Sequence, residues 1–273
     1  MAEPIVASKQ LVEEIFDGAA PRYDRAGPAL FRQFGARLVE WMNIPAGARV
    51  LDVATGTGAV LIYAARQAGV AGHVIGVDLS NEMLAEADRA ARASGLSNFE
   101  LGRMDAEQLQ FADGAFDIVT CGFALFMFPS MQAALREMYR VTRPGGLLGL
   151  TMWGKAPFDP AWKIFAEQVR KYGVEVRMPQ KVAYALGEIE TLVTDAGYGN
   201  VEIMSETHDI VYAAEEDWWG FQLTLASRAA IYRMPPETRE RFKEEYLSQL
   251  RSLFRTDGLH LPAPVLYVKG QKV

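Results

Sequence analysis

Residues 49–58 join an apolar run to a glycine turn beside one carboxylate, Asp52. The run leads straight into a turn that contains Gly56 and Gly58, and glycines let a backbone bend tightly next to a ligand. The helix that we expect to follow from Ala59 would offer unpaired N–H groups and the positive end of its dipole to the anionic part of a cofactor. The stretch therefore predicts a strand, a ligand-binding turn and a helix.

A second carboxylate, Asp78, ends the next apolar run at 73–78, twenty residues after Gly58. A carboxylate at this place can accept hydrogen bonds from both hydroxyls of a ribose. The first hypothesis is therefore a nucleoside-containing cofactor that lies across the ends of parallel strands.

The elements that would position these residues alternate between strands and helices. Helices of 10 to 15 residues between apolar strands imply right-handed crossovers and a parallel sheet that binds ligands at the carboxyl ends of its strands. The pattern predicts strands at 49–53, 73–77, 98–102, 116–121 and 147–152, and amphipathic helices at 59–68, 81–94 and 130–142.

Segments on either side of this alternation follow another plan. The late helices at 214–233 and 236–254 interrupt the path from one strand to the next, so we expect a lid within a single domain. The other predicted elements are helices at 8–20, 29–42, 157–172 and 185–196, a long strand at 201–212 and a short closing strand at 264–269. The predicted organisation of the domain 1–273 is an N-terminal lid at 1–43, a core at 44–213 plus 259–273, and a lid insertion at 214–258.

Composition narrows the function classes. The net charge of −6 over 273 residues and a pI near 5.3 argue against a nucleic-acid partner, which normally needs a basic surface. The single cysteine, Cys121, excludes an internal disulfide and fits a reducing compartment. The N-terminus carries no secretion signal and the apolar runs are too short to span a bilayer, so we expect a cytoplasmic protein. The oligomeric state is not indicated.

Two cofactors compete for the site, a dinucleotide and S-adenosylmethionine. A dinucleotide fingerprint needs a third glycine so that helix and strand pack closely, and Leu61 stands at that position. Nearly the whole chain resembles the class I S-adenosylmethionine-dependent methyltransferases, and among them the small-molecule enzymes of ubiquinone and menaquinone biosynthesis. The resemblance rests on five motifs in a fixed order, at 51–58, 77–80, 104–106, 116–119 and 143–146.

The resemblance implies a Rossmann-like, doubly wound α/β fold, with a mostly parallel seven-stranded sheet, an antiparallel last strand and a helical lid. It implies S-adenosylmethionine as cofactor and S-adenosylhomocysteine as product, with Asp78 on the ribose and Asp105 on the adenine amino group. Asp52 is expected to accept hydrogen bonds from the loop, and Cys121 to be a small buried residue nearby. The predicted cofactor-binding residues are Tyr23, Asp52, Ala54, Thr55, Gly56, Gly58, Asp78, Leu79, Met83, Met104, Asp105, Ala106 and Cys121.

The chain departs from the resemblance in two places. Ala54 stands where the family usually has the first glycine of the turn. Residues 121–128 lack the arginine and asparagine expected of a quinone-head methyltransferase, and they also lack the histidine pair of many sugar and sterol methyltransferases. These departures leave the cofactor assignment in place and speak against a quinone acceptor.

Aromatic residues after the fourth strand and on the late segments are the candidates for an acceptor pocket, although each could equally be core. The predicted pocket residues are Phe123, Phe126, Met127, Trp153, Trp218 and Trp219. The candidates for a catalytic base are Tyr23, Asp24, His208 and Arg228, with a structural role as the alternative for His208. Displacement at a sulfonium methyl can depend on alignment and dehydration alone, so a dedicated base is not required. No metal-binding set and no Gly-x-Ser-x-Gly elbow occur.

The sequence thus predicts an enzyme that moves a methyl group from S-adenosylmethionine to a small, largely apolar acceptor, at oxygen, nitrogen or carbon, by in-line displacement. A second hypothesis is a cyclase that binds the cofactor without using its methyl group. A third is a binding protein that takes up the cofactor without turnover.

Overall fold

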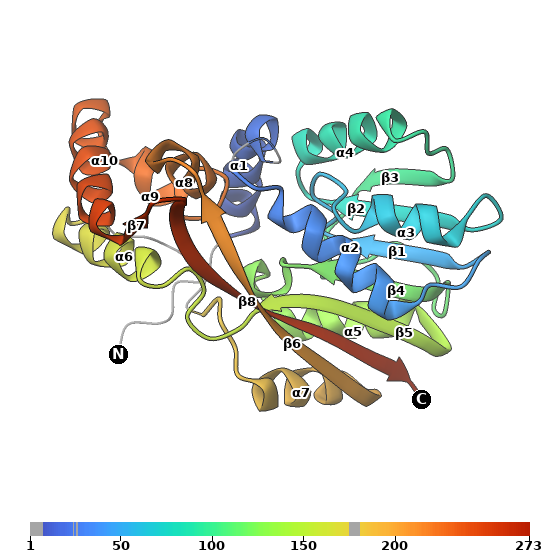
Figure 1. Ribbon diagram of the computed structural model, residues 1–273. Helices are drawn as coiled ribbons and strands as arrows, with labels where there is room; N and C mark the ends of the chain where they lie inside the picture. Colours follow the sequence, from blue (N-terminus) through green and yellow to red (C-terminus); the bar gives the residue numbers. More distant parts are fainter. Residues whose placement is uncertain (1–7, 24, 26, 175–180) are drawn as a thin grey trace.

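The computed structural model describes residues 8–23, 25, 27–174 and 181–273. Its strands are β1 (Arg49–Val53), β2 (His73–Asp78), β3 (Phe99–Arg103), β4 (Phe116–Gly122), β5 (Thr142–Trp153), β6 (Tyr198–Tyr212), β7 (Phe254–Arg255) and β8 (Gly258–Lys272). They form one sheet in the order β3-β2-β1-β4-β5-β8-β6, and β7 pairs with the beginning of β8 (Figure 1). The first five strands run parallel, whereas β8 runs antiparallel to both β5 and β6. The predicted fold class is confirmed.

Helices cover both faces of the sheet (Figure 1). One face carries α2 (Leu30–Met42), α3 (Leu61–Ala68) and α4 (Asn81–Ala93), and the other carries α5 (Met131–Val141) and α7 (Leu186–Asp195). Side chains alternate along β1, so that Val50 packs in the cluster of α2 and α3 and Leu51 packs in the cluster of α5. Ser80 and Ser130 cap α4 and α5, each accepting a hydrogen bond from a backbone N–H of the first turn.

Further helices lie beyond one end of the sheet, at the left of Figure 1. They are α6 (Ala161–Lys171), α8 (Glu215–Gln222), α9 (Arg228–Arg233) and α10 (Pro236–Leu250), and the N-terminal α1 (Lys9–Ala19) lies between them and α4. We call α8, α9 and α10 the helical cap. Its aromatic side chains pack against α6, where the ring of Phe165 lies 5.7 Å from that of Phe242 and 5.5 Å from that of Tyr246. Across the described residues, no helix has the length and the apolar character that a membrane crossing needs.

The helix predicted over 214–233 is broken in two, between α8 and α9. The Thr224 hydroxyl donates to the Phe221 carbonyl oxygen at 2.7 Å, and the Ser227 hydroxyl donates to the Gln222 carbonyl oxygen at 2.9 Å. Hydroxyl side chains that bond to nearby backbone offer it an alternative to the helical pattern. The break places residues 223–227 as a loop of the cap.

The closing strand predicted at 264–269 is much longer, because β8 runs from Gly258 to Lys272. Pro262 and Pro264 lie inside it, paired with β6 only, since the pairing with β5 begins at Val265. Their missing N–H groups therefore fall on a side without a partner strand, where proline is tolerated. His260, which precedes the predicted strand, belongs to β8 and is paired with β6.

Candidate functional site

The glycine turn after β1 brings the backbone into left-handed conformations at the edge of a cavity. Ala54, Gly56 and Gly58 have φ values of 53°, 54° and 85°. A Cβ added to Gly56 would meet no atom within 4 Å, so the conformation and not crowding favours glycine there. Ala54 adopts its positive φ with a methyl group, which supports the expectation that the turn tolerates this residue. The helix that follows, α3, begins at Leu61 and not at Ala59.

Asp52 holds this turn in shape. Its carboxylate accepts hydrogen bonds from the Thr55 hydroxyl at 2.6 Å and from the Leu61 N–H at 3.2 Å, both at Oδ2, and from the Thr120 hydroxyl at 2.8 Å at Oδ1. The side chain is buried, and burial raises its pKa to about 6 against the opposing effect of these bonds. The carboxylate thus ties the end of β1 to the turn, to the start of α3 and to β4.

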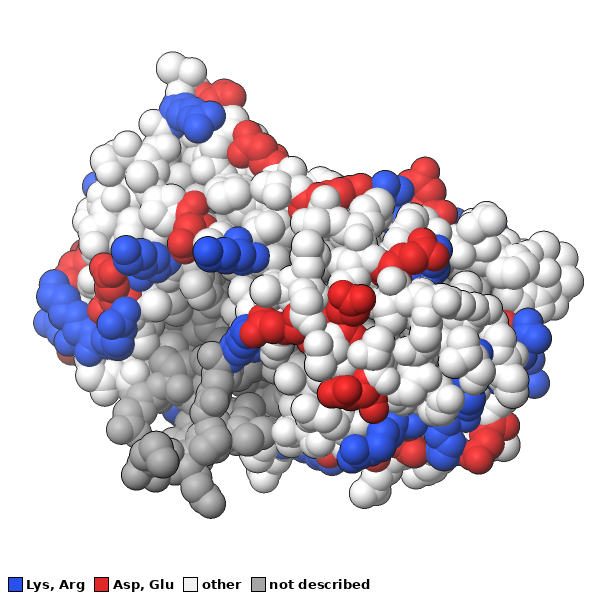
Figure 2. Space-filling view, turned by 90° about the horizontal axis from the view of Figure 1, so that it is seen from below, with Lys and Arg blue, Asp and Glu red and all other residues white. Residues whose placement is uncertain are grey.

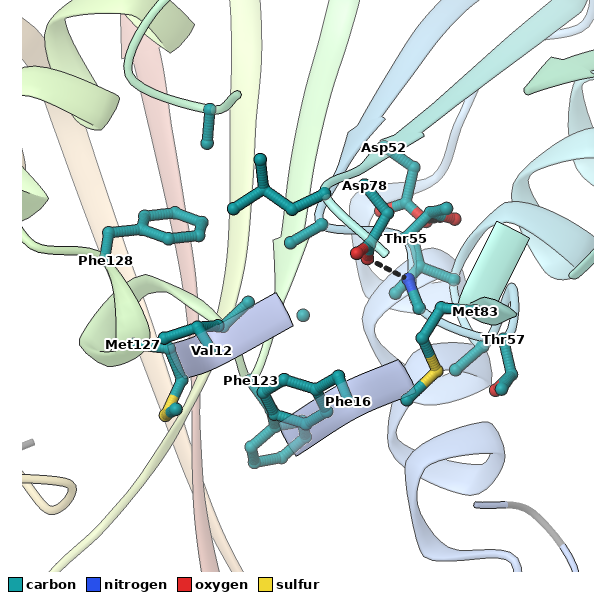
Figure 3. A pocket seen from close by; sticks show the side chains of 18 of the residues that line it. Val12, Phe16, Asp52, Thr55, Thr57, Asp78, Met83, Phe123, Met127 and Phe128 are labelled. Atoms are coloured by element: carbon teal, nitrogen blue, oxygen red, sulfur yellow. Dashed lines mark hydrogen bonds between the residues drawn. The ribbon is translucent and has the colours of Figure 1, made fainter. Parts of the chain in front are cut away.

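Asp78 stands at the end of β2, directly beside the turn. Its Oδ2 accepts the Gly56 N–H at 2.9 Å, which is the dashed line in Figure 3, and its Oδ1 accepts the Ser80 N–H at 2.9 Å. Burial raises the pKa of this carboxyl, whereas the backbone N–H groups that bond to it lower it. A carboxylate oxygen can accept more than one hydrogen bond. Because Asp78 lines the adjacent cavity, both of its oxygens can also accept hydrogen bonds from a ligand there.

The cavity beside the turn, which we call the donor cavity, encloses about 1040 Å³ including its opening to solvent. Asp52 and Asp78 lie on one side of it, across from the rings of Phe16 and Phe123 (Figure 3). The predicted cofactor residues that line it are Tyr23, Asp52, Ala54, Thr55, Gly56, Asp78, Leu79, Met83, Met104, Asp105 and Ala106. Segments from four strand ends and from the N-terminal helix therefore meet at one place.

Two predicted cofactor residues do not line the donor cavity. Gly58 faces the side chains of Ile62 and Ala87, at 3.6 Å and 3.5 Å from the position a Cβ would take. Cys121 is fully buried in the core on the α5 side of the sheet, and burial raises the pKa of its thiol. The turn and the strand direct these two residues into the protein, and the burial of Cys121 agrees with the expectation stated for it.

Helix α1 closes the donor cavity with residues that the sequence did not single out as cofactor contacts. Lys9, Val12 and Phe16 line the cavity, and the Lys9 ammonium lies 2.7 Å from both the Asp105 and the Glu107 carboxylates. These carboxylates raise the pKa of Lys9. The ion pair places a cation on Asp105, the residue that the resemblance assigned to the adenine amino group.

A polar stripe along α1 fastens it to the strand ends. Besides the Lys9 ion pair, Glu13 accepts from Arg103 at 2.6 Å and Asp17 accepts from the Ser80 hydroxyl at 2.5 Å. Residues four apart share one face of a helix, so the spacing of 9, 13 and 17 was a signal in the sequence that could have identified this contact.

A second cavity of about 570 Å³, which we call the acceptor cavity, adjoins the donor cavity. The two share Phe16, Tyr23, Phe31, Phe123 and Met127. The remaining lining residues are Phe126, Trp153, Pro157, Phe158, Trp162, Val182, Leu225 and Ala226. Among the described residues that line the acceptor cavity, none has a charged side chain, and the predicted pocket residues Phe123, Phe126, Met127 and Trp153 all take part.

Trp218 and Trp219, also predicted for the pocket, line neither cavity. Trp218 is fully buried, and its Nε1 donates to the Tyr246 hydroxyl at 2.8 Å. Trp219 is buried against the same helix, with its ring 6.3 Å from that of Phe242. Both residues hold the helical cap together, while Trp162 of α6 supplies a ring to the acceptor cavity instead.

Of the candidates for a catalytic base, two also lie away from both cavities. His208 lies in β6, 3.3 Å from a Glu206 carboxylate oxygen and against the ring of Phe34, and lines neither cavity. Arg228 donates to the carbonyl oxygen of Gly18 in α1 and so joins the helical cap to the N-terminal helix. Only Tyr23 of the described candidates lines both cavities, and Asp24 lies outside the described residues.

The donor cavity fits a nucleoside cofactor. Asp78 is a half-buried carboxylate with acceptor capacity toward the cavity, and the space beside Gly56 is open. The apolar residues Leu79, Met83, Met104 and Ala106 offer contacts to a base ring. On the outer surface shown in Figure 2, Lys and Arg side chains are interspersed with Asp and Glu side chains.

Comparison with known proteins gives consistent findings. A family profile described as a methyltransferase domain matches residues 50–146. A demethylmenaquinone methyltransferase of Staphylococcus saprophyticus is 31% identical over 220 residues, which are 74% of this chain and 93% of that protein. The crystal structure of YcgJ from Bacillus subtilis aligns with a TM-score of 0.61 at 22% identity, over 88% of this chain and 98% of that one. The [4+2]-cyclase SpnF aligns with a TM-score of 0.62 at 20% identity, over 99% and 98%.

Proposed function

Because the chain belongs to the class I S-adenosylmethionine-dependent methyltransferases, we propose that it methylates a small, largely apolar acceptor held in the acceptor cavity. The family assignment carries the coarser statement: this protein is a methyltransferase that takes S-adenosylmethionine as its cofactor and methylates a small molecule. The acceptor class and the mode of transfer are the proposal.

The observation that carries the proposal is the lining of the acceptor cavity. Apolar and aromatic side chains surround it, and the polar side-chain groups of the described lining are the Tyr23 hydroxyl and the indole N–H groups of Trp153 and Trp162, none of which is charged. A charged acceptor would lose its hydration there without a partner, which costs several kcal/mol, whereas an apolar ring would be transferred from water at a gain.

In this proposal the protein binds the cofactor and the acceptor, aligns them, and excludes water from the site. S-adenosylmethionine supplies, when bound, an electrophilic methyl group on a sulfonium sulfur. Asp78 would hold the ribose, and Leu79 and Met83 would contact the base. Helix α1 and the helical cap serve as lids that exclude water, and Arg228 joins them through the carbonyl of Gly18.

Transfer by direct displacement needs the acceptor atom in line with the methyl group, and this alignment can supply much of the rate. The acceptor cavity meets the donor cavity at a shared wall, so an acceptor that fills it faces the reacting end of the cofactor. Tyr23 is the side chain in this wall that can hydrogen-bond to an acceptor oxygen or nitrogen.

Demethylated naphthoquinols are the first acceptors to test, because the Staphylococcus saprophyticus relative is a demethylmenaquinone methyltransferase. Apolar phenols, amines and thiols of similar size form the comparison set, since residues 121–128 lack the polar side chains expected for a quinone head.

The experiment is an acceptor screen with S-adenosylmethionine that carries a deuterated methyl group. We expect an apolar acceptor to gain one labelled methyl group, with one S-adenosylhomocysteine formed for each product. A product of unchanged mass without S-adenosylhomocysteine would support cyclisation instead. Methylation confined to charged acceptors would contradict the proposal.

A further inference from the structure

The wall shared by the donor and acceptor cavities consists mainly of aromatic rings. Phe16, Tyr23, Phe31 and Phe123 contribute four of its five residues, with Met127 as the fifth. We call these four residues the aromatic collar. They come from α1, from the segment after it, from α2 and from the end of β4, and the sequence gives no pattern that would place them together.

The four rings contact one another in a continuous chain. Tyr23 stacks on Phe31 with 5.2 Å between ring centroids and 17° between planes. Phe16 meets Tyr23 edge-on at 6.2 Å, and Phe123 meets Phe31 edge-on at 5.4 Å. Phe31 is buried, but the other three are only half-buried, so they keep surface open to the cavities that they line.

We propose that the aromatic collar binds the sulfonium cation of the donor and so makes the protein prefer the charged donor to its neutral product. The inference rests on the proposed function, because a methyl group that passes from the donor cavity to the acceptor cavity must pass beside the residues that line both cavities. The face of an aromatic ring attracts a cation and gives no such attraction to a neutral thioether.

The composition of the wall supports this assignment. None of its residues carries a charged side chain, so no carboxylate at the shared wall would hold the cation by an ion pair. Asp52 and Asp78 lie across the donor cavity from Phe16 and Phe123 (Figure 3). The collar would also favour turnover, since the donor and S-adenosylhomocysteine differ at the sulfur in a methyl group and a positive charge, and the loss of that charge weakens the hold on the product.

The test compares the dissociation constants of S-adenosylmethionine and S-adenosylhomocysteine for the full chain by calorimetry. In Phe16→Leu and in Tyr23→Leu we expect the affinity for the cation to fall about fivefold relative to that for the neutral product. Tyr23→Phe keeps the ring and should keep the ratio of the wild type. Phe126→Leu makes the same change in a ring that lines only the acceptor cavity, and it should also leave the ratio unchanged.

Each outcome decides one point. The proposal is overturned if the ratio of the two dissociation constants stays at the wild-type value in both leucine variants. An equal loss of affinity for the two ligands leaves this ratio unchanged and overturns it too. A change in Phe126→Leu as large as in Phe16→Leu overturns it as well. Wild-type protein that binds neither ligand would contradict the proposed function itself. Phe16 and Tyr23 are half-buried, so these leucine variants are expected to fold.

Discussion

The donor and acceptor cavities share a wall but are specified in different ways. The turn of the donor cavity is shaped by hydrogen bonds within one short motif, such as those that Asp52 accepts from Thr55 and Leu61. The acceptor cavity depends on side chains from distant segments, such as Trp153 and Leu225, which tertiary packing brings together. The contrast teaches that a fixed cofactor can be recognised by local backbone geometry, whereas an apolar acceptor is recognised by the shape that remote elements leave between them.

Removal of the Asp78 carboxylate should have the largest effect on the donor cavity. Asp78→Ala should weaken S-adenosylhomocysteine binding about 100-fold, because charge-assisted hydrogen bonds contribute about 1.5–3 kcal/mol each and each 1.4 kcal/mol is tenfold. Calorimetry measures the change. Asp117→Ala is a matched control, because Asp117 also accepts a backbone N–H, that of Arg49 at 2.7 Å, and lines neither cavity.

If Asp78→Ala and Asp117→Ala weakened S-adenosylhomocysteine binding to the same extent, the effect would report general stability and not the ribose contact. Thermal unfolding of both variants without ligand separates the two explanations. We expect both to lose some stability, since each leaves backbone N–H groups without their partners, and only Asp78→Ala to lose affinity.

A charge placed in the acceptor cavity tests the other region. Leu225 lies in the loop between α8 and α9 and lines only the acceptor cavity. Leu225→Asp should lower kcat/KM for the acceptor found in the screen at least about tenfold, because an unpaired carboxylate opposes the burial of apolar surface. S-adenosylhomocysteine affinity should stay within about twofold of the wild type, and Leu225→Met should keep both quantities near it. Equal losses of both quantities in Leu225→Asp would mean that the two cavities do not act separately.

The same division decided what the sequence could predict. The ends of β1 and β2 and the turn were predictable because each is encoded by a short motif whose backbone geometry needs those residue types. Most residues that line the donor cavity could be predicted from these motifs. Cys121 is buried as expected, but the motif did not show that its side chain packs in the core on the α5 side and not at the cavity.

The acceptor side was largely beyond prediction. Trp218 and Trp219 were as plausible as Trp162, since the choice depends on how each helix is rotated against its neighbours. The loop that carries Leu225 was hidden inside one predicted helix. The length of β8 was underestimated because prolines such as Pro262 and Pro264 are rare inside strands, and only the sheet pairing shows that β5 does not reach them.

The smallest expected effect is on the pH dependence of stability, which should differ between the donor region and the contact of β6 with β8. In the donor region, burial raises the pKa of Asp52 from 3.8 to about 6, so folded protein binds more protons than unfolded protein between these values and stability falls as the pH rises through them. Where β6 and β8 pair, the hydrogen bonds that the His260 ring donates to Asp209 and Asp257 raise its pKa above 6.5. The stabilisation by His260 is present below pH 6.5 and is lost as the pH rises through the higher folded value.

The measurement is the difference in Tm between the wild type and His260→Asn at intervals from about pH 5.5 to about pH 9, chosen to span the titration of histidine and to lie mostly above that of Asp52. The His260 ring nitrogens lie 2.7 Å from Asp209 and 2.9 Å from Asp257, so the substitution removes a protonated ring that joins β6 to the residue before β8. Because Asp52 titrates equally in both proteins, its contribution cancels. The wild type should exceed the variant most at the acid end, and the difference should shrink above pH 6.5. A difference that stays constant, or grows with pH, would show that the charge of His260 does not stabilise its contacts with Asp209 and Asp257.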